Sequence, residues 1–235
     1  MSVDAAVQQA GWGPNDAFLQ QIDPTFYAGR VSLKPLEYQA AGGVQGGHYR
    51  LATSYSSTAA KPAAGSDIFS LRWADPTKLF VLKRFLLYVA TTTTYTASAV
   101  QDAALYKATG FTAAASSGTA VSIVAGGKLQ AARMASSGIA TGGTGLAWIS
   151  SGDLLTVGTR TLDTYPVGYG AWLNAITTIN APSALTLFDS SGPYDHPVVL
   201  GLNEGIVLQT PIGNAQAAGV SKFTVIMDWA EVPSF

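Results

Sequence analysis

Large apolar side chains recur at every second position of residues 221–232, near the end of the chain. The apolar positions are Phe223, Val225, Met227 and Trp229, and the positions between them are Lys222, Thr224, Ile226 and Asp228. A period of two places the first set on one face of an extended strand and most of the second set toward solvent. This stretch therefore predicts a half-buried β-strand, which Pro233 ends.

Short apolar runs separated by turn residues continue this pattern back to His48. The candidate strands cover residues 67–73, 79–90, 119–125, 146–150, 154–160, 184–189, 197–202 and 206–210. The run 79–90 is apolar on both faces, as expected of a central strand that is covered on each side. About ten short strands are typical of an antiparallel β-sandwich or a jelly roll, so the sequence predicts an all-β fold.

A hairpin is expected at the C-terminal end of this domain. One strand spans residues 206–210, and the loop 213–219 joins it to the strand at 221–232. Strands that follow each other along a chain often lie side by side. We therefore predict that these two strands pair antiparallel.

The secondary structure of two stretches stays open at this point. Residues 97–110 fit either a helical stripe with Gly110 as its C-cap or a strand over residues 103–108, and we favour the strand. Residues 171–178 are ambiguous in the same way.

The first forty residues differ from the rest because glycine and proline break them into short pieces, and the glycine pairs at 42–43 and 46–47 indicate a hinge or loop after them. Large apolar side chains stand between the breaks, at Trp12, Phe18, Leu19, Ile22, Phe26 and Tyr27. Disordered tails usually lack such side chains. We therefore predict an extended N-terminal arm and linker over residues 1–47 and a β-sandwich domain over residues 48–235. The arm's predicted interface with a partner consists of Trp12, Phe18, Ile22, Phe26 and Tyr27.

Charged residues make up only 11% of the chain, against about 25% in an ordinary soluble domain. A charge-poor surface has little electrostatic protection against association, so we expect a homo-oligomer or a larger assembly. The net charge of −1 comes without any cluster of Lys or Arg, which argues against nucleic-acid binding. The absence of cysteine excludes disulfides and thiolate metal sites.

No segment has the pattern of a membrane span or a signal peptide. The most apolar run, residues 79–90, is too short to cross a bilayer and carries Lys83 and Arg84 at its middle. Residues 1–10 contain Asp4 and no positively charged side chain or apolar core. We therefore expect a soluble protein that is made in a cytoplasm and does not bind membranes.

Ser, Asp and His gather in one stretch, residues 189–197. A hydrolase would need Ser190 or Ser191 as the nucleophile and His196 as the base, with the preceding Asp to orient it. Adjacent Asp and His side chains tend to point apart on an extended chain, and no G-x-S-x-G turn is present. The other histidine, His48, has no metal-ligating residue close to it in sequence. We therefore predict no catalytic residue, no cofactor site and no metal site.

Aromatic side chains in loop-like or boundary regions suggest glycan binding as a second possible function. They are Trp12, Tyr165, Tyr169, Trp172 and Tyr194. Exposed rings could stack on sugar rings, as in a tail-fibre or adhesin module that binds host glycans. Buried rings would instead fill the core and the subunit interfaces, where aromatic residues are enriched, and we favour this interpretation.

Three groups of residues stand out between Gly65 and the C-terminus. They are GSDIFSLRWADPTKL (65–79), GTRTLD (158–163), and PVVLGLNEGIV (197–207) closing with TVIMDWAEV (224–232). The set resembles virion structural proteins of tailed bacteriophages, of the decoration or cement type that coats the head. The resemblance implies a non-enzymatic jelly-roll sandwich, often trimeric, on the capsid surface of the virion. It also implies that the major capsid protein is the partner, bound over the symmetry axes of the lattice.

The resemblance does not extend to the residues before Gly65. The role of the predicted arm in gripping a capsid is therefore a hypothesis that rests on its own apolar side chains.

Overall fold

The computed structural model describes residues 20–22, 29–31, 47–58, 62–121, 123, 137–139, 145–150, 155–174, 183–191, 196–213 and 218–233. The chain divides into two compact units, residues 1–36 and 37–235. In the first unit, β1 (Gln20–Ile22) pairs antiparallel with β2 (Gly29–Val31). The rest of residues 1–46 lies outside the described residues. The extended arm and the boundary at residue 47 therefore stay predictions.

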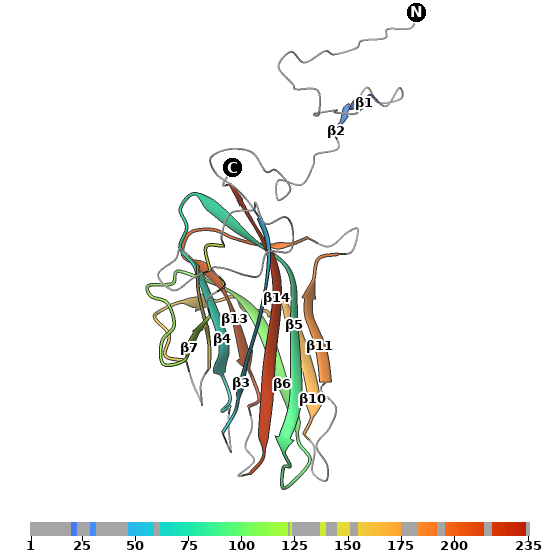
Figure 1. The fold of residues 1–235 in the computed structure, drawn as a ribbon, viewed down its shortest axis with the longest axis vertical. Helices are drawn as coiled ribbons and strands as arrows, with labels where there is room; N and C mark the ends of the chain where they lie inside the picture. Colours follow the sequence, from blue (N-terminus) through green and yellow to red (C-terminus); the bar gives the residue numbers. More distant parts are fainter. Residues whose placement is uncertain are drawn as a thin grey trace, which may run out of the picture. The chain divides into compact units, whose positions relative to one another are not determined.

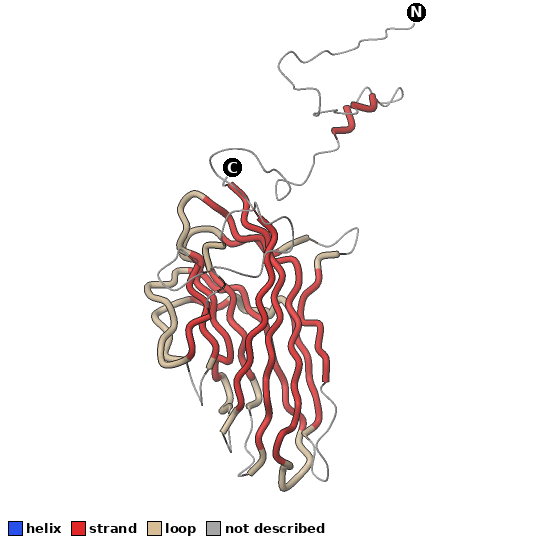
Figure 2. Tube along the Cα trace, in the orientation of Figure 1, coloured by secondary structure: helices blue, strands red, loops and turns tan. Residues whose placement is uncertain are grey.

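The second unit is built from β-strands, and the part of it that the structure describes contains no helix (Figure 1, Figure 2). Its strands are β3 (Gly47–Ser56), β4 (Ser66–Trp73), β5 (Lys78–Thr93), β6 (Val100–Thr109), β7 (Thr119–Val121), β8 (Gly145–Ile149), β9 (Thr161–Leu162), β10 (Gly168–Leu173), β11 (Ser183–Asp189), β12 (Val198–Leu200), β13 (Glu204–Thr210) and β14 (Val220–Pro233). The all-β prediction is confirmed. The described residues accordingly include no helix that could cross a membrane.

The strands form two antiparallel sheets that pack against each other (Figure 1). The five-stranded sheet has the order β11-β5-β14-β3, with β12 also paired to β5. The seven-stranded sheet has the order β10-β6-β13-β4-β8-β7, with β9 also paired to β6. The chain changes sheet at each step from β3 to β6 and again from β13 to β14, which is the strand arrangement of a jelly roll. The predicted jelly-roll sandwich is therefore confirmed.

The predicted hairpin between residues 206–210 and 221–232 is wrong. β13 lies between β4 and β6 in one sheet, whereas β14 lies between β3 and β5 in the other. Both edges of each strand are already paired, and packed sheets lie about 10 Å apart. The connection between β13 and β14 therefore crosses from one sheet to the other.

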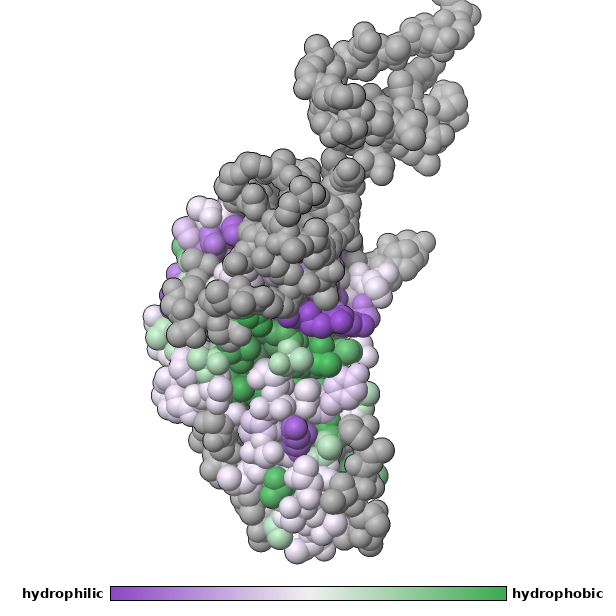
Figure 3. Space-filling view, viewed as in Figure 1, coloured by the Kyte–Doolittle hydropathy of each residue, from purple (hydrophilic) through white to green (hydrophobic). Residues whose placement is uncertain are grey.

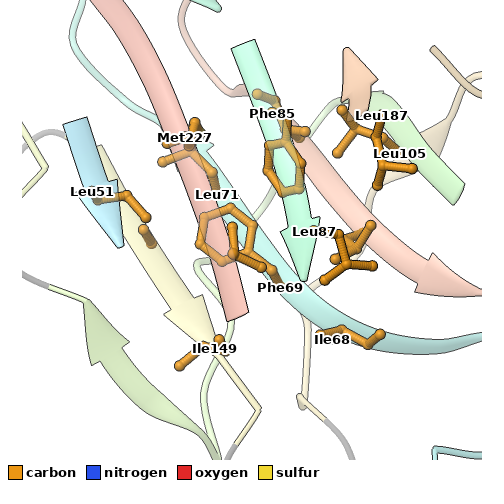
Figure 4. Close-up of a cluster of buried hydrophobic side chains, with 14 of the residues drawn as sticks. Leu51, Ile68, Phe69, Leu71, Phe85, Leu87, Leu105, Ile149, Leu187 and Met227 are labelled. Carbon is orange, nitrogen blue, oxygen red and sulfur yellow. The ribbon is translucent and has the colours of Figure 1, made fainter. Parts of the chain in front are cut away.

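The alternation in β14 builds the core as predicted. Phe223, Val225, Met227 and Trp229 are each at most 1% exposed. Figure 4 shows apolar side chains of both sheets pointing toward one another, among them Met227, Phe85 and Leu87 of the five-stranded sheet and Phe69 and Leu71 of the seven-stranded one. Burying one such side chain contributes about 1.5–3 kcal/mol, so this interior supplies most of the stabilisation.

The stretch 97–110 is a strand, as we favoured. β6 places Ala103 and Leu105 in the core and pairs with β13 on one side and β10 on the other. β10 ends at Leu173, and residues 175–178 of the second ambiguous stretch lie outside the described residues.

Candidate interaction surfaces

The serines of the hydrolase hypothesis come directly after β11. Ser190 Oγ donates to the main-chain oxygen of Lys83 at 3.1 Å, and Ser191 N donates to Asp189 Oδ1 at 2.9 Å. His196 is exposed just before β12, and the Asp that would orient it lies outside the described residues. Within the described ranges, no group of three or more His, Cys, Asp or Glu side chains could hold a metal ion.

The aromatic side chains considered for sugar stacking differ in how far they are exposed. Trp172 is 8% exposed and packs edge-on against Phe223, with 5.8 Å between the ring centroids. The prediction that Trp172 could belong to a sugar-binding platform is therefore wrong, because its side chain lies on the inward face of β10 and packs in the core. Tyr165 and Tyr169 are 82% and 55% exposed. Trp12 and Tyr194 lie outside the described residues.

The outer face of the five-stranded sheet carries two uncharged rows of side chains between charged ones. Ala52, Ile226 and Leu86 pair in one row across β3, β14 and β5. They face outward because their neighbours along each strand are buried in the core. Ser54, Thr224 and Tyr88 form the second row, and Lys222 stands in the row after it. Figure 3 shows this face with an apolar area beside a hydrophilic band, and an exposed apolar area of this kind is typical of surfaces that pack against protein.

The hydrophilic side of this face is a compact ion cluster of Arg50, Asp228 and Arg84. Arg50 Nη2 donates to Asp228 Oδ2 at 2.8 Å, and Arg84 Nε donates to the same oxygen at 3.0 Å. Burial acts to raise the pKa of Asp228, but the hydrogen bonds and charges of the two arginines outweigh it and hold this pKa below its ordinary value. The cluster therefore carries one net positive charge.

A carboxylate is buried on the inward side of β14. Ser137 Oγ donates to Glu231 Oε1 at 2.6 Å, Gly138 N at 2.9 Å and Trp229 Nε1 at 3.2 Å. Lys78 Nζ lies 3.9 Å from Oε2. Burial raises the pKa of Glu231, although these donors and the nearby ammonium group favour its charged form. The side chain fastens the Ser137–Gly138 segment to the strand.

Two segments, residues 110–118 and residues 155–163 with β9 inside them, cover part of the seven-stranded sheet's outer face. Thr112 N donates to Thr159 O at 3.0 Å, which joins the two segments. Phe111 is buried in a small cluster with Ala108, Val207 and Leu162. The strand predicted over 154–160 is wrong for its described part, which forms one isolated bridge, because these residues pack as a cover and extend no sheet.

Arg160 ties this cover to β4 through a buried ion pair. Its Nη2 lies 2.7 Å from Asp67 Oδ2, and both side chains are at most 10% exposed. Gln209 Nε2 donates to Asp67 Oδ1 at 2.8 Å. Burial raises the pKa of Asp67 despite the hydrogen bonds and the charge that oppose it. Asp67 and Arg160 both lie in the stretches that carry the resemblance, but nothing in the sequence links them as partners.

A second uncharged surface lies at the β10 end of the seven-stranded sheet. Its large exposed side chains are Val100, Tyr169, Leu173 and Ile212, each between 53% and 64% exposed. Leu173 and Val100 are direct partners in the pairing of β10 with β6. Single exposed apolar residues are ordinary, but a group of four beside one strand marks a contact surface.

The side chains of the predicted arm interface lie outside those that the structure describes, so Trp12, Phe18, Ile22, Phe26 and Tyr27 stay predictions. Comparison with known proteins gives no assignment, since no protein-family model and no curated protein matches the chain.

Proposed function

We propose that this chain is a non-enzymatic virion structural protein that decorates the head of a tailed phage and stabilises its lattice. The observation that carries the proposal is the outer face of the five-stranded sheet, where two rows of uncharged side chains lie side by side across β3, β14 and β5. A jelly roll is an architecture of viral capsid domains, although a fold alone does not determine a function. The partners proposed are the major capsid protein and further copies of this chain, as a trimer.

The sparse charge of the chain supports this role. A cement protein stabilises a shell by adding buried interface between neighbouring capsomers, and a standard interface buries about 1,600 Å². Charged residues are depleted at the centre of such interfaces. Rows such as Ala52, Ile226 and Leu86 can be desolvated without separating charges from water.

Ile226→Arg tests whether this face meets the capsid. The guanidinium would be buried without a partner in the contact, so we expect binding to empty heads of the cognate major capsid protein to weaken at least ~10-fold. The measurement is cosedimentation of the purified protein with the heads. Leu202→Arg is the matched control, since Leu202 is 53% exposed away from this face. Equal loss in both variants, or none in Ile226→Arg, would contradict the assignment of this face.

Removal of residues 1–40 tests the predicted arm. We expect the truncated protein to keep its circular dichroism and its unfolding midpoint, because the core cluster of the described residues is built from residues that follow position 47. We expect it to lose occupancy on empty heads. A full-length variant with Trp12, Phe18, Phe26 and Tyr27 all replaced by serine separates the loss of apolar contacts from the loss of chain length. Full occupancy after truncation would rule out the arm as an anchor.

A glycan-binding tail-fibre or adhesin module is the alternative, favoured by the exposed ring of Tyr165. A glycan array distinguishes the two functions. Signals that disappear in Tyr165→Ala would support the alternative, whereas a silent array together with head binding supports decoration.

A further inference from the structure

The β10 strand forms one end of the seven-stranded sheet and pairs only with β6 among the described strands. Its sequence, GYGAWL, contains no charge and no proline, and its register with β6 is unbroken. Natural sheets usually protect such an edge with a charge, a proline, a bulge or a very short strand. The other sheet ends follow this rule, since β3 carries Arg50, β11 has a register shift and β7 has three residues.

Three residues of β10 direct their main-chain N–H and C=O groups to the edge that does not pair with β6. Asn174 N donates to Ala99 O at 3.1 Å, in register with the pairing of Trp172 and Gly170 to β6. Hydrogen-bonding residues alternate along an antiparallel pair. Trp172 and Gly170 therefore direct their main-chain groups to β6, and those of Tyr169, Ala171 and Leu173 point to the open side.

The same three residues are exposed on the outer face. Val100 and Ile212 enlarge this surface with further apolar side chains. The one acid beneath it, Asp102, is buried, and it accepts hydrogen bonds from Ile212 N at 2.8 Å and Tyr169 Oη at 3.1 Å. An occupant of this edge therefore meets an uncharged surface and a row of free main-chain donors and acceptors.

We infer that the occupant is a second copy of this chain, with β10 paired antiparallel to β10 about a twofold axis at Ala171. The order Tyr169, Ala171, Leu173 is self-complementary in this register. Each Tyr169 ring lies opposite Leu173 of the second copy, and two alanines meet at the axis, where little space is needed. Aromatic and branched side chains in directly opposed positions stabilise a sheet.

The absence of charge also selects a second copy over a charged partner. In a twofold contact the residue on the axis faces its own copy, and the residues beside it lie close to theirs, so a charge near the axis would be repelled by the same charge of the second copy. All three pairs join residues whose main-chain groups point to the open edge, so each pair exchanges two hydrogen bonds. The two seven-stranded sheets then continue into each other.

This contact is independent of the capsid role. A twofold contact alone makes dimers, or joins two trimers into a hexamer. Light scattering on a sizing column should therefore give twice or six times 24.3 kDa. A mass of one or three chains at micromolar concentration would overturn the proposal.

Ala171→Cys tests the position of the axis directly. The chain has no cysteine, so the variant carries a single thiol per copy. Opposed residues in a hydrogen-bonded pair have Cα atoms about 5.5 Å apart, within the range of a disulfide. Mild oxidation should convert the variant to a covalent dimer on non-reducing gels. Ala52→Cys, exposed on the other sheet, should stay monomeric. Absence of the covalent dimer, or equal yields from both variants, would overturn the register.

Leu173→Glu provides a test that does not depend on a thiol. It places a carboxylate against the ring of Tyr169, whose face carries negative charge density, in each half of the contact, so the mass should fall from two chains to one, or from six to three. Leu202→Glu, exposed to a similar extent elsewhere, should keep the wild-type mass. An unchanged mass in Leu173→Glu would contradict the contact.

Discussion

Glu231→Ala is expected to lower the free energy of unfolding by about 3–5 kcal/mol, because it leaves three buried donors without their acceptor and each such donor costs about 1–3 kcal/mol. These donors are the Ser137 hydroxyl, the Gly138 amide and the Trp229 indole. Removal of a buried charge offsets a part of this loss. Chemical denaturation at pH 7 measures the difference.

Glu231→Gln is the matched control. Its amide oxygen can still accept from Ser137 and Trp229, so we expect a loss of less than about 1.5 kcal/mol, the net value of one ordinary hydrogen bond. If alanine were tolerated as well as glutamine, the carboxylate would not be what fastens the Ser137–Gly138 segment to β14.

The pH dependence of stability gives a further expectation for this residue. Burial raises the pKa of Glu231 in the folded protein above the ordinary value of 4.5. At a pH between 4.5 and this raised pKa, the folded protein therefore binds a proton more readily than the unfolded chain. The stabilisation by this proton is complete below pH 4.5 and is lost as the pH rises through the folded pKa. The stability of the wild type relative to Glu231→Gln should therefore fall as the pH rises from 4.5 toward 7. The raised pKa of Asp67 is present in both proteins and cancels in this difference.

The sequence predicted the strands and their buried faces because apolar and polar residues alternate with a period of two, and this alternation is visible in consecutive residues. The inward set of β14 follows directly from Phe223 to Trp229. The same parity places Glu231 on the inward face, so the alternation already contained a signal for the buried carboxylate. The Trp229 indole lies on the same face of β14, so only the donors from the distant segment, Ser137 and Gly138, could not be inferred.

The pairing of strands could not be predicted by the same argument. Alternation tells which side chains face inward, but both sheets of a sandwich have an inward face, so β13 and β14 fit equally well in one sheet or in two. The contact surface at β10 depends on this topology, because Tyr169 and Leu173 matter only once their strand lies at a sheet end. The run 154–160 was likewise mistaken for a strand, since a buried apolar residue such as Leu155 occurs in a loop that packs on a sheet as well as in a strand.

Arg160→Met is expected to lower the free energy of unfolding by about 3–5 kcal/mol, the usual cost of leaving a buried charge without its partner. Among the described residues, Asp67 would keep the amide of Gln209 as its one hydrogen-bond donor. The loss should concentrate in the loop cover, so chymotrypsin should cleave after Phe111 faster than in the wild type.

The double variant Asp67→Leu with Arg160→Met separates the value of the ion pair from the penalty of breaking it. Replacement of a whole buried pair by apolar side chains is often neutral, so we expect the double variant to regain more than half of the loss. Lys107→Met is the control, because its ion pair with Glu204 at 3.1 Å is 28% exposed on both sides and should contribute no more than about 1 kcal/mol. A double variant as unstable as Arg160→Met would mean that Arg160 stabilises the cover through its packing, with little contribution from its charge.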